Sequence, residues 1–235
     1  MRGVFVTGTD TEVGKTVIAS AIAATLAASG ERVASFKPAV TGLHDPAGLP
    51  PDHELLQRST ASGQQLDAIA PYRFGPAVSP HLAAELAGVE IAPSHLIAAA
   101  EAAAAHADAL VVEGVGGLLV PLTTRYLVRD FAAELGLPLV IAARPGLGTI
   151  NHTLMTLECA RSAGLEIAAV VLTPWPPFPN EIEQSNRQTI ERLGNVETFC
   201  LPRLEVADMP PESGLPAGCW VSGPREAHSP WRRAA

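Results

Sequence analysis

One stretch near the amino terminus combines glycine, lysine and threonine in an order suited to phosphate binding. It joins an apolar run to an Ala-rich segment and reads Gly8-Thr9-Asp10-Thr11-Glu12-Val13-Gly14-Lys15-Thr16. Between a strand and a helix, such a loop turns backbone N–H groups and a helix N-terminus toward phosphate oxygens. Lys15 then reaches the β- and γ-phosphates, and the Thr16 hydroxyl reaches Mg²⁺. Five residues separate Gly8 from Gly14, where four are usual.

The choice of basic residues is uneven. The chain has 14 Arg but only two Lys, Lys15 and Lys37. An ammonium is a compact point charge and a guanidinium a wide planar fork, so a tight phosphate pocket can require lysine. Lys37 follows a predicted strand and precedes Pro38, which would bring its ammonium to the same sheet edge as the loop. A surface lysine at a strand end is the simpler alternative, and the scarcity of lysine favours a catalytic role.

Two acidic residues are candidates to support Mg²⁺. Glu113 follows the apolar run 109–112 and precedes the glycines at 114, 116 and 117. Enzymes with such phosphate-binding loops keep a carboxylate at this kind of strand end, and glycines let a ligand approach the backbone. A plain turn is the alternative. Asp52 opens a predicted helix, where it either caps the N-terminus or serves as a second Mg²⁺ carboxylate.

A fourth motif reads Leu147-Gly148-Thr149-Ile150-Asn151-His152 and follows a predicted strand. Thr149 is suited to cap the next helix. Asn151 and His152 would then face a ligand or a partner subunit. His81 follows Ser79-Pro80 at another helix start, and packing is the favoured interpretation there.

Short apolar runs alternate with helical segments along the chain, which predicts an α/β fold in a single domain. The sheet would be doubly wound and mostly parallel, with helices on both faces and ligands at the carboxyl ends of the strands. We predict strands at 3–7, 32–36, 109–112, 139–143, 167–172 and 196–201. We predict helices at 15–29, 52–59, 81–87, 93–107, 127–135, 150–163 and 180–193.

Composition limits the classes of function. The net charge is −8 and the arginines are scattered, so no nucleic acid or anionic membrane is expected as a partner. No apolar run is long enough for a membrane span and no signal peptide is recognised, which favours the cytoplasm. Three separated cysteines indicate neither a disulfide framework nor a zinc site. We expect the α/β domain over 1–202 and an extension over 203–235 that packs on it, with its last dozen residues a loose tail.

Taken together, the four motifs resemble the dethiobiotin synthetase family of P-loop enzymes. The resemblance extends to about residue 202, and the five-residue gap in the loop is a mark of this family. It implies ATP-dependent carboxylation and ring closure of 7,8-diaminononanoate with CO₂, giving dethiobiotin, ADP and phosphate in biotin biosynthesis. One amine would capture CO₂ as a carbamate. A carbamate oxygen would then attack the γ-phosphate and form a carbamic–phosphoric anhydride. The second amine would then close the ring.

The resemblance also implies roles for individual residues. The catalytic residues would be Lys37, Lys15 and Thr11, and the Mg²⁺ ligands Thr16, Asp52 and Glu113. Nucleotide contacts would come from Glu12, Val13, Gly14, Lys15, Thr16, Thr173 and Pro202. Diaminononanoate or its carbamate would be held by Thr11, Lys37, Thr41, Gly116, Gly117 and Asn151. The family forms a homodimer with active sites at the interface, where Asn151 would reach the substrate of the partner subunit.

The main alternative is a regulatory P-loop ATPase like the plasmid-partition and cell-division switches. Those proteins carry a second lysine near the start of the loop. This chain has Thr9-Asp10-Thr11 at that place, which argues against them. Ligases of the cobyric-acid type need a glutamine-handling domain, for which 235 residues leave no room. A small-molecule kinase would pass the phosphate to its product instead of releasing it.

Two departures from the family pattern concern Thr41 and Thr173. Thr41 stands where serine is common and keeps the hydroxyl. Thr173-Pro174 stands where the family often has Asn-Asp, whose asparagine reads the nucleobase. We therefore predict weak discrimination among ATP, CTP and GTP, measured as steady-state KM values for the three nucleotides. A strong preference for ATP would contradict this prediction.

Overall fold

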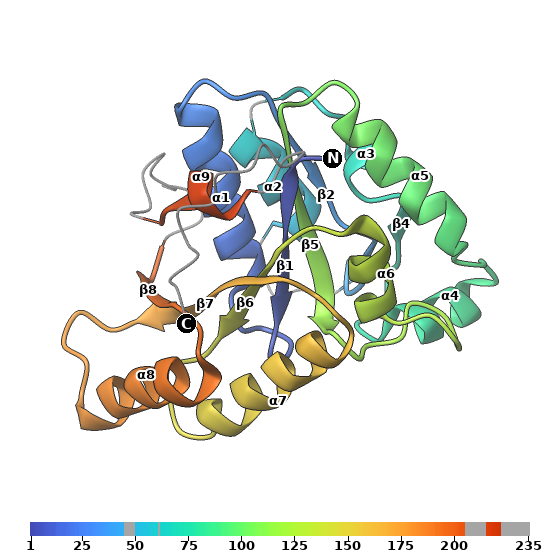
Figure 1. Cartoon of the computed structure of the whole chain (residues 1–235). Helices are drawn as coiled ribbons and strands as arrows, with labels where there is room; N and C mark the ends of the chain where they lie inside the picture. The colour runs from blue at the N-terminus through green and yellow to red at the C-terminus, as the bar shows by residue number, and fades with distance from the viewer. Residues whose placement is uncertain (45–49, 61, 205–214, 222–235) are drawn as a thin grey trace.

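The computed structural model describes residues 1–44, 50–60, 62–204 and 215–221. Its centre is a six-stranded sheet in which all five neighbouring pairs are parallel (Figure 1). The strands in spatial order are β2 (Val33–Phe36), β5 (Ala109–Gly117), β1 (Gly3–Gly8), β6 (Leu139–Ala143), β7 (Ile167–Trp175) and β8 (Thr198–Pro202). The predicted α/β fold with a parallel sheet is confirmed. The chain moves from β1 to one side of the sheet and then to the other, so a crevice is expected beside β1.

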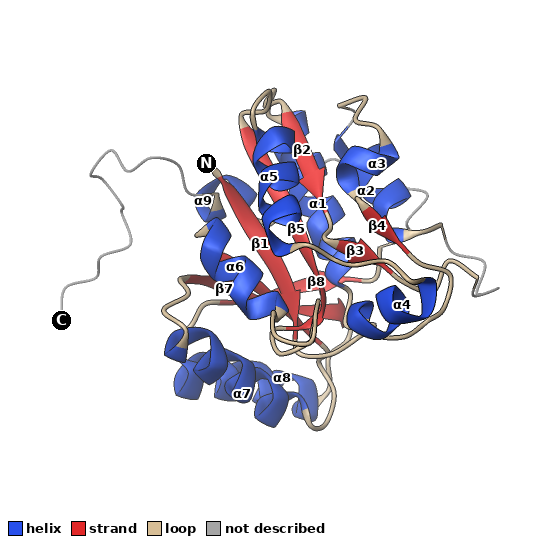
Figure 2. Ribbon diagram, turned by 90° about the vertical axis from the view of Figure 1, so that its right-hand side faces the viewer, coloured by secondary structure: helices blue, strands red, loops and turns tan. Residues whose placement is uncertain are grey.

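Helices cover both faces of the sheet (Figures 1 and 2). One face carries α1 (Lys15–Ala28), α2 (Asp52–Thr60) and α9 (Ala217–Trp220). The other carries α4 (Pro80–Ala87), α5 (Pro93–Ala104), α6 (Val128–Leu135), α7 (Thr149–Ser162) and α8 (Glu181–Gly194). The short α3 (Leu66–Ile69) contacts both α2 and α5. None of the described helices has the length and apolarity that a membrane crossing needs.

Strand β1 shows how the sequence divides its side chains between the two faces. Val4 and Val6 pack with α1, while Phe5 points to the opposite side, as the two-residue period of a strand requires. There Phe5 and Phe36 meet Phe131 of α6, with ring centroids 5.9 and 6.0 Å apart. All three rings are fully buried. Both faces of the central strand are thus apolar, which leaves polar chemistry to its carboxyl end.

A second, two-stranded parallel sheet was not predicted. It pairs β3 (Ala39–Val40) with β4 (Tyr72–Arg73), and two-residue strands are too short to show a periodic pattern. The pairing continues beyond the strands, because Phe74 donates its N–H to Val40 and Leu43 donates to Phe74. These bonds fix the chain just after Lys37.

Several element boundaries differ from the predictions, with β7 running on to Trp175 and not ending at 172, and the carboxyl-terminal part adds to the core. The helix predicted at 93–107 ends at Ala104, and the strand predicted at 109–112 runs on to Gly117. Leu215 and Trp220 are buried on the α1 face, and the Trp220 ring lies 5.1 Å from that of Phe199. The predicted loose tail falls outside the described residues.

Candidate functional site

The phosphate-binding loop lies between β1 and α1, as predicted. Gly14 caps α1 with φ 88°, a left-handed conformation that favours glycine. The loop closes tightly over Gly8, where an added Cβ would stand 2.7 Å from Val13 Cγ2. Val13 itself is buried in the α1 core, so its side chain anchors the loop while its backbone stays in it. Lys15 folds over the loop and donates to the Asp10 carbonyl at 2.8 Å.

Strand register brings the second lysine and the buried acid together. Phe36 of β2 pairs with Val112 of β5, so the residues that follow, Lys37 and Glu113, lie side by side. Glu113 also pairs with Val6 of β1, just before the loop. Since parallel strands share one carboxyl edge, these pairings alone place Lys37 and Glu113 beside the phosphate-binding loop.

Contacts join four of the predicted residues into one cluster. Lys37 Nζ lies 2.6 Å from Glu113 Oε1 and 2.9 Å from Asp52 Oδ2. The Thr16 hydroxyl lies 2.9 Å from one oxygen of each carboxylate. Asp52 is the first residue of α2, but its carboxylate contacts this cluster. The Pro51 carbonyl accepts the first hydrogen bonds of the helix. The alternative of Asp52 as a helix cap is therefore wrong.

Burial and mutual charge set the protonation of the cluster. Burial, aided by the Lys37 ammonium, lowers the pKa of Lys15 to about 8. Burial alone would also lower the pKa of Lys37, but the carboxylates of Asp52 and Glu113 outweigh it and raise that pKa. Burial raises the pKa of Glu113, an effect that Asp52 reinforces and Lys37 opposes. The charges that act on Lys15 thus include the Lys37 ammonium and the carboxylates of Glu113 and Asp52.

The same cluster fits a magnesium ion. Glu113 is fully buried, and its Oε2 has no hydrogen-bond partner among the described residues. Asp52 opposite it is partly exposed, and Thr16 adds a hydroxyl. No group of three or more His, Cys, Asp or Glu suited to a metal occurs in the described ranges. Two carboxylates with a hydroxyl suit Mg²⁺, which takes oxygen ligands and completes its shell with phosphate oxygens and water.

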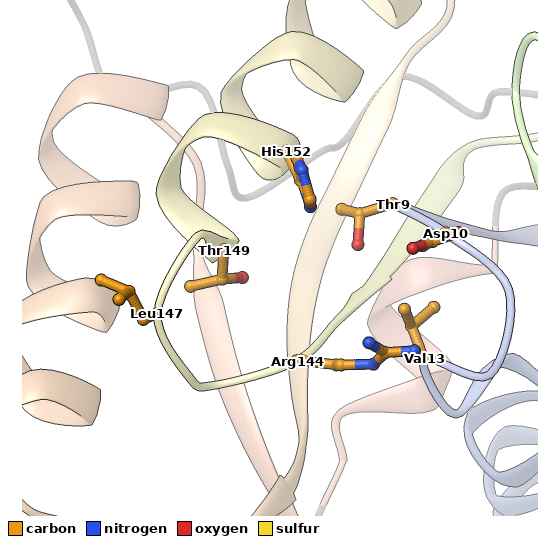
Figure 3. Close-up of a pocket in the computed structure, with 7 residues that line it drawn as sticks. All are labelled: Thr9, Asp10, Val13, Arg144, Leu147, Thr149 and His152. Atoms are coloured by element: carbon orange, nitrogen blue, oxygen red, sulfur yellow. The ribbon is translucent and has the colours of Figure 1, made fainter.

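A cavity of about 90 Å³ lies between the loop and the start of α7, and Figure 3 shows the residues that line it. Thr9, Asp10 and Val13 line one side, and Thr149 and His152 of α7 line another. Gly148 caps α7 in a left-handed conformation, and the Thr149 side chain makes no cap. Thr149 is buried beside Thr153 instead, so the prediction that it caps the helix is wrong.

The structure places the remaining predicted residues around this edge. Thr173 at the end of β7 is buried, and its methyl would lie 2.4 Å from a Cβ added to Gly14. Gly116 has φ 60° and lies near the Thr11 methyl, with Gly117 close to the Gly8 carbonyl. Glu12 is exposed in the loop with φ 54°, and Thr41 is half-buried after β3. Asn151 is exposed on α7 near Met155 Sδ, and Pro202 is exposed at the end of β8.

Two residues beside the site were not among its predicted members. Arg144 directly follows β6 and donates to the Thr11 carbonyl at 3.1 Å. A charge at the end of an apolar strand was a signal that could have identified it. Asn186 of α8 is buried and donates to the carbonyls of Pro145 and Gly146. The sequence offered Asn186 and Arg187 only as guesses for holding the substrate carboxylate, because α8 is rich in polar residues over its whole length.

We predict that Gly14→Ala weakens nucleotide binding about tenfold or more, because a side chain there is strained at positive φ and meets Thr173. The measurement is the Kd for ATP by calorimetry. Thr173→Ala in the same chain would remove the clash but not the strain, so it should restore only part of the affinity. Unchanged affinity in Gly14→Ala would contradict the loop geometry described above.

Comparisons with known proteins identify the fold and the family of this chain. A family model described as an AAA domain matches residues 2–210. Solved structures of a ParA-family ATPase from Chlorobium tepidum TLS and of the septum site-determining protein MinD from Pyrococcus horikoshii OT3 superpose with TM-scores of 0.55 and 0.51. They cover 88% and 86% of this chain, and this chain covers 86% and 81% of theirs. At 13% and 14% identity they show the fold alone.

Curated relatives are much more similar in sequence. The ATP-dependent dethiobiotin synthetase of Anaeromyxobacter dehalogenans strain 2CP-1 is 45% identical over 201 residues, which cover 86% of this chain and 89% of the relative. The enzyme of the same name from Bacillus subtilis strain 168 is 39% identical over 198 residues, or 83% of this chain and 84% of the relative. The family predicted from the four motifs is thereby confirmed, and the chain belongs to the ATP-dependent dethiobiotin synthetases.

Proposed function

We propose that this chain forms dethiobiotin from 7,8-diaminononanoate, CO₂ and MgATP, with release of ADP and phosphate. The observation that carries the proposal is the cluster in which Lys37 lies between two carboxylates beside the phosphate-binding loop. Lys15 shares its electrostatic environment. A partition ATPase would need a further lysine near the start of the loop, where this chain has Thr9-Asp10-Thr11.

The cluster suits a reaction in which negative charge appears repeatedly at one place. One amine of the substrate adds to CO₂ and loses a proton, which leaves a carbamate anion. A carbamate oxygen then forms a bond to the γ-phosphorus as the bond to ADP breaks. Lys15 and Lys37 would hold the oxygens that carry charge in both steps, and such fixed cations are a major source of catalysis. The second amine finally attacks the carbamate carbon and phosphate leaves.

Thr16, Asp52 and Glu113 would hold Mg²⁺ in this scheme. The bound ion supplies positive charge to the β- and γ-phosphate oxygens. Lys37 pairs with both carboxylates in the free protein. We infer that its ammonium turns to the carbamate and the γ-phosphate when the carboxylates bind the metal. Thr11, Thr41 and the backbone at 116–117 would bracket the diamine.

We propose in addition a homodimer in which Asn151 reaches the partner's diaminononanoate. Support comes from apolar side chains around Asn151 that are unusually exposed in a single chain. Leu147 is 93% exposed and Met155 55%, and Phe178 before the neighbouring helix α8 is 91% exposed. Such a patch is typical of a surface that another protein covers. A second copy of the chain fits, because Asn151 is itself exposed and lies beside Met155 on the same helix.

Mutation of Lys37 tests the proposed mechanism most directly. We predict that Lys37→Ala lowers kcat by roughly 100-fold or more, because the charge opposite the carbamate is lost. Lys37→Arg should also be poor, since a planar fork cannot replace the compact ammonium in a buried site. Steady-state kinetics give both values, and thermal unfolding checks the fold. Full activity of Lys37→Arg would undo the argument from lysine scarcity, and an unchanged kcat in Lys37→Ala would remove Lys37 from the mechanism.

Phosphate release tests the function itself. Diaminononanoate, bicarbonate and MgATP are mixed with the protein, and each component is left out in turn. Release should require all of them and should match the dethiobiotin formed mole for mole. Phosphate release that is independent of the diamine would instead favour a regulatory ATPase.

A further inference from the structure

The segment between β6 and α7 is held from two sides. On one side, the Arg144 guanidinium donates to the carbonyl of Thr11 in the phosphate-binding loop. On the other, the Asn186 amide of α8 donates to the carbonyl of Pro145 at 2.9 Å and to that of Gly146 at 3.1 Å. The segment therefore links the loop to α8, and it leads directly into the first turn of α7.

Asn186 is an unusual residue for its position. Most of α8 is exposed, and its inward-facing stripe consists of Asn186, Ile190 and Gly194, at helical spacing. An apolar residue would suit such a stripe for packing alone. Asn186 is only 5% exposed, and both of its hydrogen bonds need the amide nitrogen as donor. Loss of a buried donor leaves its acceptors unsatisfied, which is costly.

The segment that Asn186 holds leads to the part of the site that we assign to the diamine. The residues to which the held segment leads are Thr11 and Asn151, both assigned above to diaminononanoate. Thr16, on the nucleotide side, is held by other contacts, with Asp52 and Glu113. A displaced segment would thus disturb the diamine before it disturbs MgATP.

We propose that Asn186 is a positioning residue for diaminononanoate, acting by donating to the carbonyls of Pro145 and Gly146 at the start of α7. The inference rests on the proposed function, because it takes the roles of Thr11 and Asn151 from it. Asn186 does not itself touch the substrate in this scheme.

The test compares Asn186→Asp with Asn180→Asp, the same chemical change on the same helix. Asn180 caps α8 as an acceptor, from the N–H groups of Ile182 and Glu183, and aspartate accepts equally well there. Aspartate at 186 keeps the size of asparagine but presents an acceptor to two carbonyls. We expect the KM for diaminononanoate to rise about tenfold in Asn186→Asp, with the KM for ATP within about twofold of wild type. Asn180→Asp should match wild type in both.

Asn186→Ala and Asn186→Ser form a second pair in case the buried aspartate prevents folding. A serine hydroxyl can donate to one of the two carbonyls, so Ser should keep part of the diamine affinity that Ala loses. If KM for both substrates changes equally, or if Asp restores what Ala loses, Asn186 acts by packing and the inference is overturned. A wild-type protein without dethiobiotin synthesis would refute the proposed function instead, so the two failures are distinguishable.

Discussion

The ion pair between Lys37 and Glu113 is the interaction on which the site depends. Its atoms lie 2.6 Å apart and both side chains are buried, where an unpaired charge would be very unfavourable. Each partner therefore fixes the other, and strand register fixes both beside the phosphate-binding loop. Asp52 and Thr16 complete the arrangement from α2 and α1. A buried pair of this kind contributes little net stability, so its retention is better explained by the chemistry that it prepares.

The sheet explains why this chemistry can sit at one edge of an otherwise apolar domain. Strand β1 is buried on both faces, with valines toward α1 and Phe5 toward α6. Polar groups are therefore concentrated where the strands end, and every parallel strand ends at that edge. The β6–α7 segment joins the edge to α7 and α8, whose exposed apolar side chains suit a second subunit. The proposed nucleotide and substrate sites thus share one edge of the sheet.

Much of the fold and the core of the site could be predicted from the sequence. The parallel sheet, the loop, Lys37 and Glu113 follow from strand ends, which apolar runs mark clearly. The role of Asp52 could not be decided, because a helix start suits a cap and a ligand equally. The N-cap of α7 was predicted one residue too late, at Thr149, whereas the N-cap residue is Gly148. Asn186 was only a guess for holding the substrate carboxylate, and its contacts could not be predicted because its partners are backbone carbonyls about 40 residues away, which no local pattern records.

The most direct test of the central claim is a structure of the protein with a non-hydrolysable ATP analogue, Mg²⁺, diaminononanoate and bicarbonate as the source of CO₂. The account predicts that Lys15 Nζ and Lys37 Nζ both lie within hydrogen-bond distance of the γ-phosphate or carbamate oxygens. It also predicts that Thr16, Asp52 and Glu113 surround the metal. A complex in which Lys37 stays sealed between Asp52 and Glu113, away from both ligands, would contradict it.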